Sequence, residues 1–190
     1  MRGTDQANIR GRQPKRRLLP RWMALTLTPL VLLLGHVVAP QQLSLLSARH
    51  GWANGEPGLL NLLGVIPIGA GAALLVWTFR LHFVAVRDSF EMKGTQNYLV
   101  LIGPYRYTRN PMYLFGMLIW LGWIILYGSV AVLAGAVIIW GIVAMLVVPW
   151  EERNLEARFG EAYLTIIHSV PRWSAGGAAD VLTQNQKKRK

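Results

Sequence analysis

The sequence predicts an all-α membrane protein with about four transmembrane helices and a C-terminal amphipathic helix at the membrane surface. Hydrophobic residues make up 53% of the 190 residues. Four apolar stretches have about the length of roughly 20 residues that a bilayer-crossing helix needs. The chain also carries a net charge of +11, and the positive residues flank the apolar stretches instead of interrupting them. The remaining polar chain is too short to form an independent soluble domain.

The first two expected spans are Trp22–Ala39 and Leu59–Phe79. No small-x-small cleavage pattern follows the first one, so we interpret it as a retained helix and not as a signal peptide. The second span is rich in small residues, which let neighbouring helices approach closely, and we expect Pro67 to kink it. We expect this helix to continue past its apolar part as far as Arg87.

The third and fourth expected spans, Pro111–Tyr127 and Val130–Trp150, are joined by only two residues, Gly128 and Ser129. Such a tight hairpin returns the chain to the face where the third span begins. Beyond the fourth span, apolar residues recur at three- and four-residue spacing, which is typical of an amphipathic interfacial helix. They are Leu155, Phe159, Ala162, Tyr163, Ile166 and Ile167. We expect one continuous helix here, weakened only slightly by Gly160.

The distribution of positive charge predicts the orientation. Seven Lys and Arg residues precede the first span, one lies between spans one and two, five lie between spans two and three, and seven follow span four. The positive-inside rule then places both termini and the connection around residues 80–110 in the cytoplasm. Anionic lipid headgroups account for the charge excess, so we expect membrane lipids and no nucleic acid as partners.

These patterns divide the chain into four segments: a basic N-terminal segment (1–21), two transmembrane helices with a cytoplasmic extension (22–98), a core (99–173) and a basic C-terminal tail (174–190). The absence of cysteine excludes disulfides and thiol nucleophiles. No two histidines have the spacing of metal ligands, so we expect no metal site.

The most polar stretch between two apolar segments is Gly103–Tyr113, with the sequence GPYRYTRNPMY. Asn110 and Pro111 are typical of a helix start, as N-cap and first helical residue. The free N–H groups of such a start, close to Arg106 and Arg109, favour a carboxylate or a phosphate. The alternative is a positively charged loop that anchors a membrane helix, with its tyrosines at the interface.

A second polar group, Glu151 and Glu152, follows directly at the end of the fourth span. Carboxylates are unusual at a cytoplasmic helix flank. They either pair with nearby arginines (Arg106, Arg153 or Arg158) on the surface, or hold hydroxyls or a cation of a ligand.

Together the two groups resemble a known family. GPYRY-x-RNPMY, a helical hairpin, EE-x-x-L-x-x-RFG-x-x-Y and finally VPRW at residues 170–173 are similar to the integral-membrane methyltransferases. These are the isoprenylcysteine carboxyl methyltransferases and the phospholipid (phosphatidylethanolamine) N-methyltransferases. The resemblance covers Leu99 to Trp173. It implies an S-adenosylmethionine site at the cytoplasmic membrane surface, formed by the first segment and the glutamate pair.

Carried over by position, the resemblance implicates Arg109, Pro111, Tyr113, Glu151 and Glu152 in cofactor binding, and we add Tyr105 and Asn110 to this expected cofactor-binding set. In this interpretation a glutamate binds the ribose diol or the ammonium of the cofactor, Arg109 its carboxylate and Tyr113 its sulfonium. Arg109, Tyr113 and Arg172 are the candidate catalytic residues. Asn110 departs from the histidine of the carboxyl methyltransferases, which leaves no imidazole base at that position.

We therefore expect an S-adenosylmethionine-dependent O- or N-methyltransferase that acts on a lipophilic acceptor, whether prenylated, phospholipid or otherwise membrane-partitioned. The first alternative is a non-catalytic membrane scaffold or subunit with the same fold. A small transporter is a second one, but no ionisable residue lies deep in spans three and four, where an ion pathway needs one.

Overall fold

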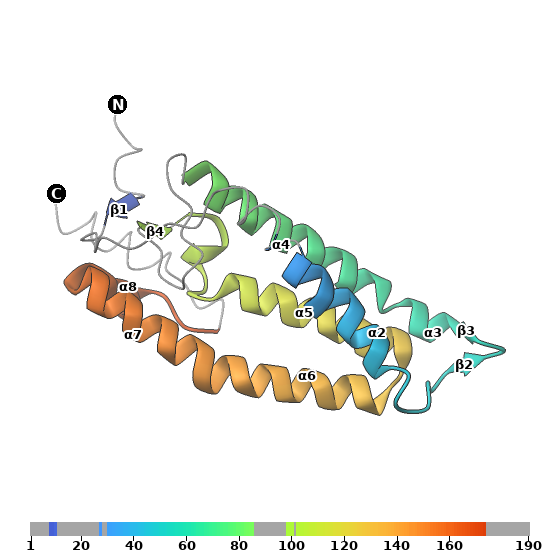
Figure 1. Ribbon diagram of the computed structural model, residues 1–190. Helices are drawn as coiled ribbons and strands as arrows, with labels where there is room; N and C mark the ends of the chain where they lie inside the picture. The colour runs from blue at the N-terminus through green and yellow to red at the C-terminus, as the bar shows by residue number, and fades with distance from the viewer. Residues whose placement is uncertain (1–7, 11–26, 28–29, 86–97, 101, 174–190) are drawn as a thin grey trace. The chain divides into compact units, whose positions relative to one another are not determined.

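The computed structural model describes residues 8–10, 27, 30–85, 98–100 and 102–173 (Figure 1). Most of the basic N-terminal segment, the beginning of the first expected span, the connection 86–97 and the tail 174–190 lie outside these residues. The described chain is mostly helical, as the sequence predicts.

The chain divides into two compact units. Unit 1 consists of Met1–Leu19, Thr78–Pro111 and Val148–Lys190, and unit 2 of Pro20–Trp77 and Met112–Val147. Each unit is described by itself below.

The helices that build unit 2 are η1 (Leu34–Val38), α2 (Ala39–Leu43), α3 (Leu59–Leu62), α4 (Val65–Ala85), α5 (Pro111–Tyr127), α6 (Val130–Ile142) and η3 (Val143–Val147). Both η1 and η3 are π-helical. In the described residues, two helices are long and apolar enough to cross a membrane, Leu59–Leu81 and Val130–Phe159. The apolar helices Leu30–Leu43 and Pro111–Tyr127 are shorter. The bounds predicted for the third span are those of the helix α5.

The second span is irregular just before Pro67, the residue at which we expect a kink. The helix is interrupted at residues 63–64, between α3 and α4. Because proline has no N–H, it cannot bond the carbonyl of Leu63. The N–H of Ile66 bonds this carbonyl instead, at 3.2 Å, which tightens the turn.

Small residues let α4 and α5 approach closely within unit 2. A Cβ added at Gly71 would lie 2.8 Å from the carbonyl oxygen of Phe115, and one added at Gly122 would lie 2.8 Å from the backbone nitrogen of Ile68. Both distances are below any real contact, so larger residues would push the helices apart. Gly69, by contrast, has no neighbour there. The predicted role of small residues is therefore confirmed at only some of these positions.

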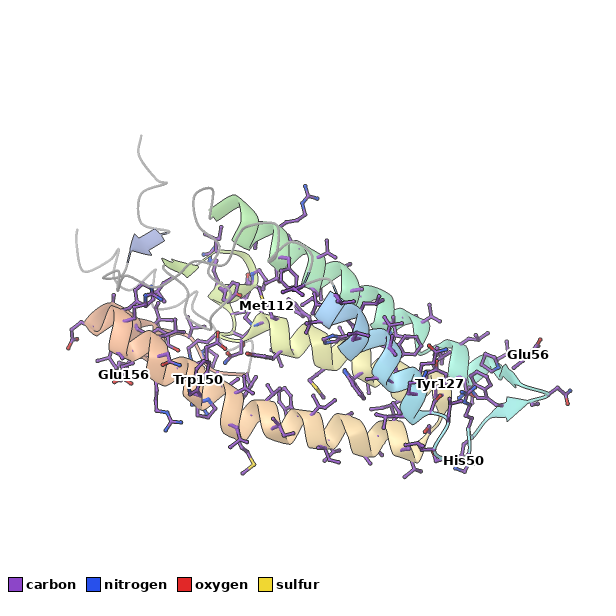
Figure 2. All side chains as sticks on the ribbon, in the orientation of Figure 1. His50, Glu56, Met112, Tyr127, Trp150 and Glu156 are labelled. Atoms are coloured by element: carbon purple, nitrogen blue, oxygen red, sulfur yellow. The ribbon has the colours of Figure 1, made fainter. Side chains whose placement is uncertain are left out.

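The loop between the first two helices contains a β-hairpin that we did not predict. Strands β2 (Trp52–Ala53) and β3 (Glu56–Pro57) pair through the turn Asn54-Gly55, where both residues have positive φ. An Asn-Gly pair is the strongest short signal for such a turn. The side chain of Trp52 donates to the carbonyl of Leu126 at 2.8 Å and stacks on Tyr127. Figure 2 shows Tyr127 and His50 at the hairpin end of this unit.

Unit 1 contains β1 (Asn8–Arg10), β4 (Tyr98–Val100), the 3-10 turn η2 (Gly103–Arg106), α7 (Val148–Phe159) and α8 (Glu161–Ser169). We did not predict the antiparallel pairing of β1, in the basic N-terminal segment, with β4. A three-residue strand is too short to show a periodic pattern, and its partner is about 90 residues away.

The helix continues beyond Trp150, as predicted, but it ends at Phe159 and does not extend through residue 167. Gly160 has φ of 53° and ψ of −128°, a conformation that only glycine adopts readily, and α8 starts after it. The break folds α8 onto a small core of Leu99, Tyr163, Ile166 and Val170. Gly160 therefore turns the chain so that residues 170–173 lead back toward the segment before α5.

Candidate functional site

The segment before α5 is held by local backbone bonds. Gly103 has a positive φ of 60° and leads into η2, where the N–H groups of Tyr107 and Thr108 both donate to the carbonyl of Pro104. Asn110 N then donates to the hydroxyl of Thr108 at 3.3 Å. Because Thr108 and Asn110 are both buried, this stretch is a fixed turn and not a loose surface loop.

The residues after α8 bind this turn directly. Arg109 N donates to the carbonyl of Pro171 at 3.0 Å, and the hydroxyl of Thr108 donates to the carbonyl of Arg172 at 2.8 Å. The side-chain amide of Asn110 reaches the same carbonyl at 3.4 Å. Two segments more than 60 residues apart are therefore joined, and their arginine side chains are brought to one place.

Glu152, on the first half of α7, binds both arginines. Arg172 forms a two-point contact, with Nε 3.1 Å from Oε1 and Nη2 bonded to Oε2. Arg109 Nη1 lies 3.0 Å from the same Oε1. The side chains of Arg109 and Glu152 are each only 12% exposed, so water screens this ion pair little. We call Arg109, Glu152 and Arg172 the charged cluster.

The charged cluster is not fully satisfied by its own members. Within the described residues, Arg109 Nε and Nη1 are buried without a well-directed hydrogen bond, although Nη1 lies close to Glu152. An arginine with such unused donors is suited to bind an additional anion.

Tyr163, on α8, lies beside the charged cluster and is 3% exposed. Burial, with the negative charge of Glu152 as a second cause, raises the pKa of Tyr163 to about 12, and Arg109 opposes this shift. The hydrogen bond to Glu152 raises the pKa of Arg172 above its usual value. Tyr163 is therefore a neutral hydroxyl and Arg172 is charged throughout the physiological range.

The structure brings together Arg109, Asn110, Glu152 and Arg172 from the predicted set. Tyr105 lies in η2 of the same unit and is half-buried, and Pro111 is the buried first residue of α5. Glu151 is half-buried next to Glu152. Tyr113 belongs to unit 2, whose position relative to unit 1 is not determined. Glu152 pairs with Arg109 and Arg172 instead of the arginines that we considered for a surface pair.

Two residues of this region were not among the predicted site residues. Thr108 fixes the turn and binds the chain after α8, but a lone threonine between Tyr107 and Arg109 gives no signal in the sequence. Tyr163 was assigned only to the apolar stripe of the helix. Its position within the EE-x-x-L-x-x-RFG-x-x-Y motif could have suggested a place near the glutamate pair.

The comparison with known proteins agrees with this architecture. The phospholipid methyltransferase family matches residues 60–162, which is more than half of the chain. The matched region contains the turn before α5 and both glutamates, and it ends before Arg172. No curated protein and no solved structure matches the chain. The chain therefore belongs to the phospholipid methyltransferase family, a family of membrane methyltransferases.

Proposed function

We propose that the protein is an integral-membrane S-adenosylmethionine-dependent methyltransferase that methylates a lipophilic acceptor by O- or N-methyl transfer. The observation that carries the proposal is the position of Glu152 between Arg109 and Arg172. The ion pair between Glu152 and Arg109 links the two segments that we expect to form one site. A contribution to folding stability does not by itself explain such a partly buried ion cluster, because the desolvation of three charges offsets most of their attraction.

The residues of the charged cluster fit the cofactor. S-adenosylmethionine carries a carboxylate, an ammonium, a ribose diol and the sulfonium that supplies the methyl group. The unused donors of Arg109 suit the carboxylate. Glu152 accepts from Arg172 through both oxygens, but a carboxylate has about four acceptor positions, so room for a further donor remains. The neighbouring Glu151 offers a second carboxylate on the same turn of α7.

In this proposal each residue of the site has a positioning role. Arg109 and the N-terminus of α5 at Asn110 and Pro111 bind the cofactor carboxylate, and Glu151 and Glu152 bind its ammonium or diol. Tyr105 and Tyr113 supply aromatic surfaces. Arg172 holds Glu152 in place and is the candidate contact for a polar group of the acceptor. In-line methyl transfer depends mainly on such positioning and on the exclusion of water.

The proposed arrangement in the membrane has four transmembrane helices, with both termini and the charged cluster on the cytoplasmic side. The segment 99–173 forms the methyltransferase core, and 22–98 forms the first two helices with their extension. We assign α8 to the membrane surface because its buried residues Tyr163 and Ile166 lie on one side while others are exposed. The acceptor enters from the bilayer.

The test measures cofactor binding to three isosteric variants by calorimetry in detergent. We expect Glu152→Gln and Glu151→Gln to weaken S-adenosylmethionine binding, because each removes a charge-assisted hydrogen bond worth roughly 1.5–3 kcal/mol, or about ten- to a hundredfold in affinity. The matched control is Glu156→Gln, a change at an exposed position of the same helix (Figure 2). It should bind the cofactor like the unmodified protein.

Two results would contradict the proposal. Unchanged affinity for S-adenosylmethionine in both Glu151→Gln and Glu152→Gln would mean that the two glutamates are purely structural. Failure of the unmodified, folded protein to bind S-adenosylmethionine would favour the non-catalytic membrane subunit instead.

A further inference from the structure

Arg49 is the only lysine or arginine in the loop between α2 and α3, which is the outer loop of the proposed topology. The positive-inside bias disfavours an arginine there. Its backbone is fixed: Arg49 pairs with Ser129 in an isolated antiparallel bridge, and the N–H of His50 donates to the carbonyl of Gly128 at 3.2 Å. The side-chain amide of Asn61 donates to the carbonyl of His50 at 3.1 Å. Arg49 is therefore attached to the turn between α5 and α6.

The side chain of Arg49 is held by three further residues. Its Cζ lies 4.6 Å from the ring centroid of Trp52 and 5.0 Å from that of Tyr127. Its Nη2 donates to the hydroxyl of Ser44, a buried residue, at 2.8 Å. All these residues belong to unit 2. The guanidinium is thus positioned without any ligand, which lowers the entropic cost of binding one.

These contacts leave most of the N–H donors of Arg49 available. Contacts with aromatic rings use the faces of the planar guanidinium, whereas its N–H groups point outward in the plane. Within the described residues, the bond to Ser44 is the only hydrogen bond of this side chain, and no carboxylate pairs with it. Arg49 is half-buried, and its Nε and Nη1 are not among the buried atoms without a partner. These two nitrogens are therefore accessible from outside the protein.

The surroundings of Arg49 are those of a membrane–water boundary. Trp52 and Tyr127 are the residue types enriched at the level of the lipid headgroups. Four leucines at the adjoining ends of the apolar helices are between 65% and 86% exposed: Leu45, Leu46, Leu59 and Leu60. Leucines this exposed at the end of a membrane helix are suited to contact acyl chains. The accessible guanidinium edge thus lies at the depth of the lipid phosphates.

The charge of the loop determines which headgroup fits. Its only carboxylate, Glu56, forms no ion pair with Arg49 among the described residues. Figure 2 shows Glu56 on the β2–β3 hairpin, apart from Tyr127. A zwitterionic headgroup brings an ammonium as well as a phosphate, and no carboxylate beside Arg49 receives it. An anionic headgroup requires only the guanidinium.

We propose that Arg49 binds the phosphate of an anionic phospholipid, whose acyl chains lie against the four exposed leucines. The edge of a guanidinium matches two phosphate oxygens and donates to both, a geometry that an ammonium cannot reproduce. The assignment to the outer leaflet rests on the proposed topology. Binding itself requires no methyl transfer, so this inference stands or falls apart from the proposed activity.

The experiment uses the full-length protein labelled with 5-fluorotryptophan, in nanodiscs of dioleoylphosphatidylcholine. The probe is dioleoylphosphatidylglycerol, added in increasing proportion. The variant Trp52→Phe identifies the fluorine resonance of Trp52, whose ring lies beside the guanidinium. We expect the anionic lipid to shift this resonance, because a bound phosphate changes the charge beside the ring. Inorganic phosphate added to the phosphatidylcholine nanodiscs should not shift it, because it lacks the acyl chains.

Three variants test the role of the guanidinium. Arg49→Gln should abolish the response or require about ten- to a hundredfold more phosphatidylglycerol, the effect of a lost charge-assisted hydrogen bond. Arg49→Lys keeps the charge but not the two-point geometry, so its response should lie between Arg49→Gln and the unmodified protein. The matched control, Arg80→Gln, removes an exposed positive charge from α4 and should leave the response unchanged. If Arg49→Gln does not fold, Arg49→Lys and the comparison of the three anion conditions in the unmodified protein still decide the question.

Three results would overturn the inference. A Trp52 resonance that ignores phosphatidylglycerol would leave Arg49 a structural contact of the loop. An equal response in Arg49→Gln would assign the shift to the general charge of the membrane. An equal response to inorganic phosphate would identify a site for a free anion and not for a lipid.

Discussion

Glu152 pairs with two arginines that come from different parts of the chain, and these contacts hold the charged cluster in place. Removing one partner of a partly buried ion pair leaves an uncompensated charge, which costs more than the pair itself contributes. Each arginine is in turn fixed by its own backbone, Arg109 through its N–H and Arg172 through its carbonyl. The side chains are therefore positioned before any ligand binds, which lowers the entropic cost of binding.

Substitutions of Asn110 distinguish a positioning role of this residue from a role in the chemical step. Asn110→Asp cannot donate to the carbonyl of Arg172, and it adds a negative charge near the proposed carboxylate site, so S-adenosylmethionine affinity should fall. Asn110→Ala should lose affinity as well, and loss of the N-cap should lower the free energy of unfolding by about 0.5–2 kcal/mol. Asn110→His should retain part of the activity. Affinity and methyl-transfer rate are measured for all three variants.

The positioning role of Asn110 would be wrong if the Asp variant bound the cofactor like the unmodified protein while the Ala variant lost turnover without any loss of binding. Asn110 would then contribute to the chemical step.

At the scale of elements, the single residue between α7 and α8 determines where the chain after α8 returns. Gly160 holds a conformation that costs other residues about 1–3 kcal/mol. Its position between Glu152 on α7 and Tyr163 on α8 links the charged cluster to the small core that contains Leu99. The turn at Gly160 is thus part of what brings Arg172 to Glu152.

We expect Gly160→Ala to lower the free energy of unfolding by about 1–3 kcal/mol and to weaken S-adenosylmethionine binding, because the strain acts on both helices. The control is Gly141→Ala in α6, where an added Cβ has no neighbour and the higher helix propensity of alanine should stabilise by up to about 1 kcal/mol. Denaturant titration in detergent measures both. Equal stability of the two variants would show that the turn is not strained.

The sequence predicted the elements with a long, regular pattern and missed those that depend on one residue or on distant pairing. The bounds of α5 follow from a Pro start and an apolar run up to Gly128. The hairpin at Asn54-Gly55 had a turn signal that we did not use. The break at Gly160 was underestimated, since a glycine in a helical pattern is often tolerated. The pairing of Glu152 with Arg172 depends on that break, so no local pattern could have indicated it.

At the scale of the whole molecule, the charges on the connections predict the topology. Reporter fusions at residue 95 and at the C-terminus should report the cytoplasm, and a fusion at residue 54 the opposite side. The reason is the five and seven positive residues of the inner segments against one in the outer loop. A reporter at residue 95 on the outer side would contradict the site assignment, because the cytoplasmic cofactor could not reach the charged cluster.

The most direct test of the central claim is the transfer of a labelled methyl group from S-adenosylmethionine to a total membrane lipid extract by the purified protein. We predict that the label enters the lipid phase with the unmodified protein and with Glu156→Gln, and that Glu152→Gln lowers the rate by about ten- to a hundredfold at low cofactor concentration. A folded protein that binds the cofactor but transfers no label, or a Glu152→Gln variant that transfers it at the full rate, would contradict the account.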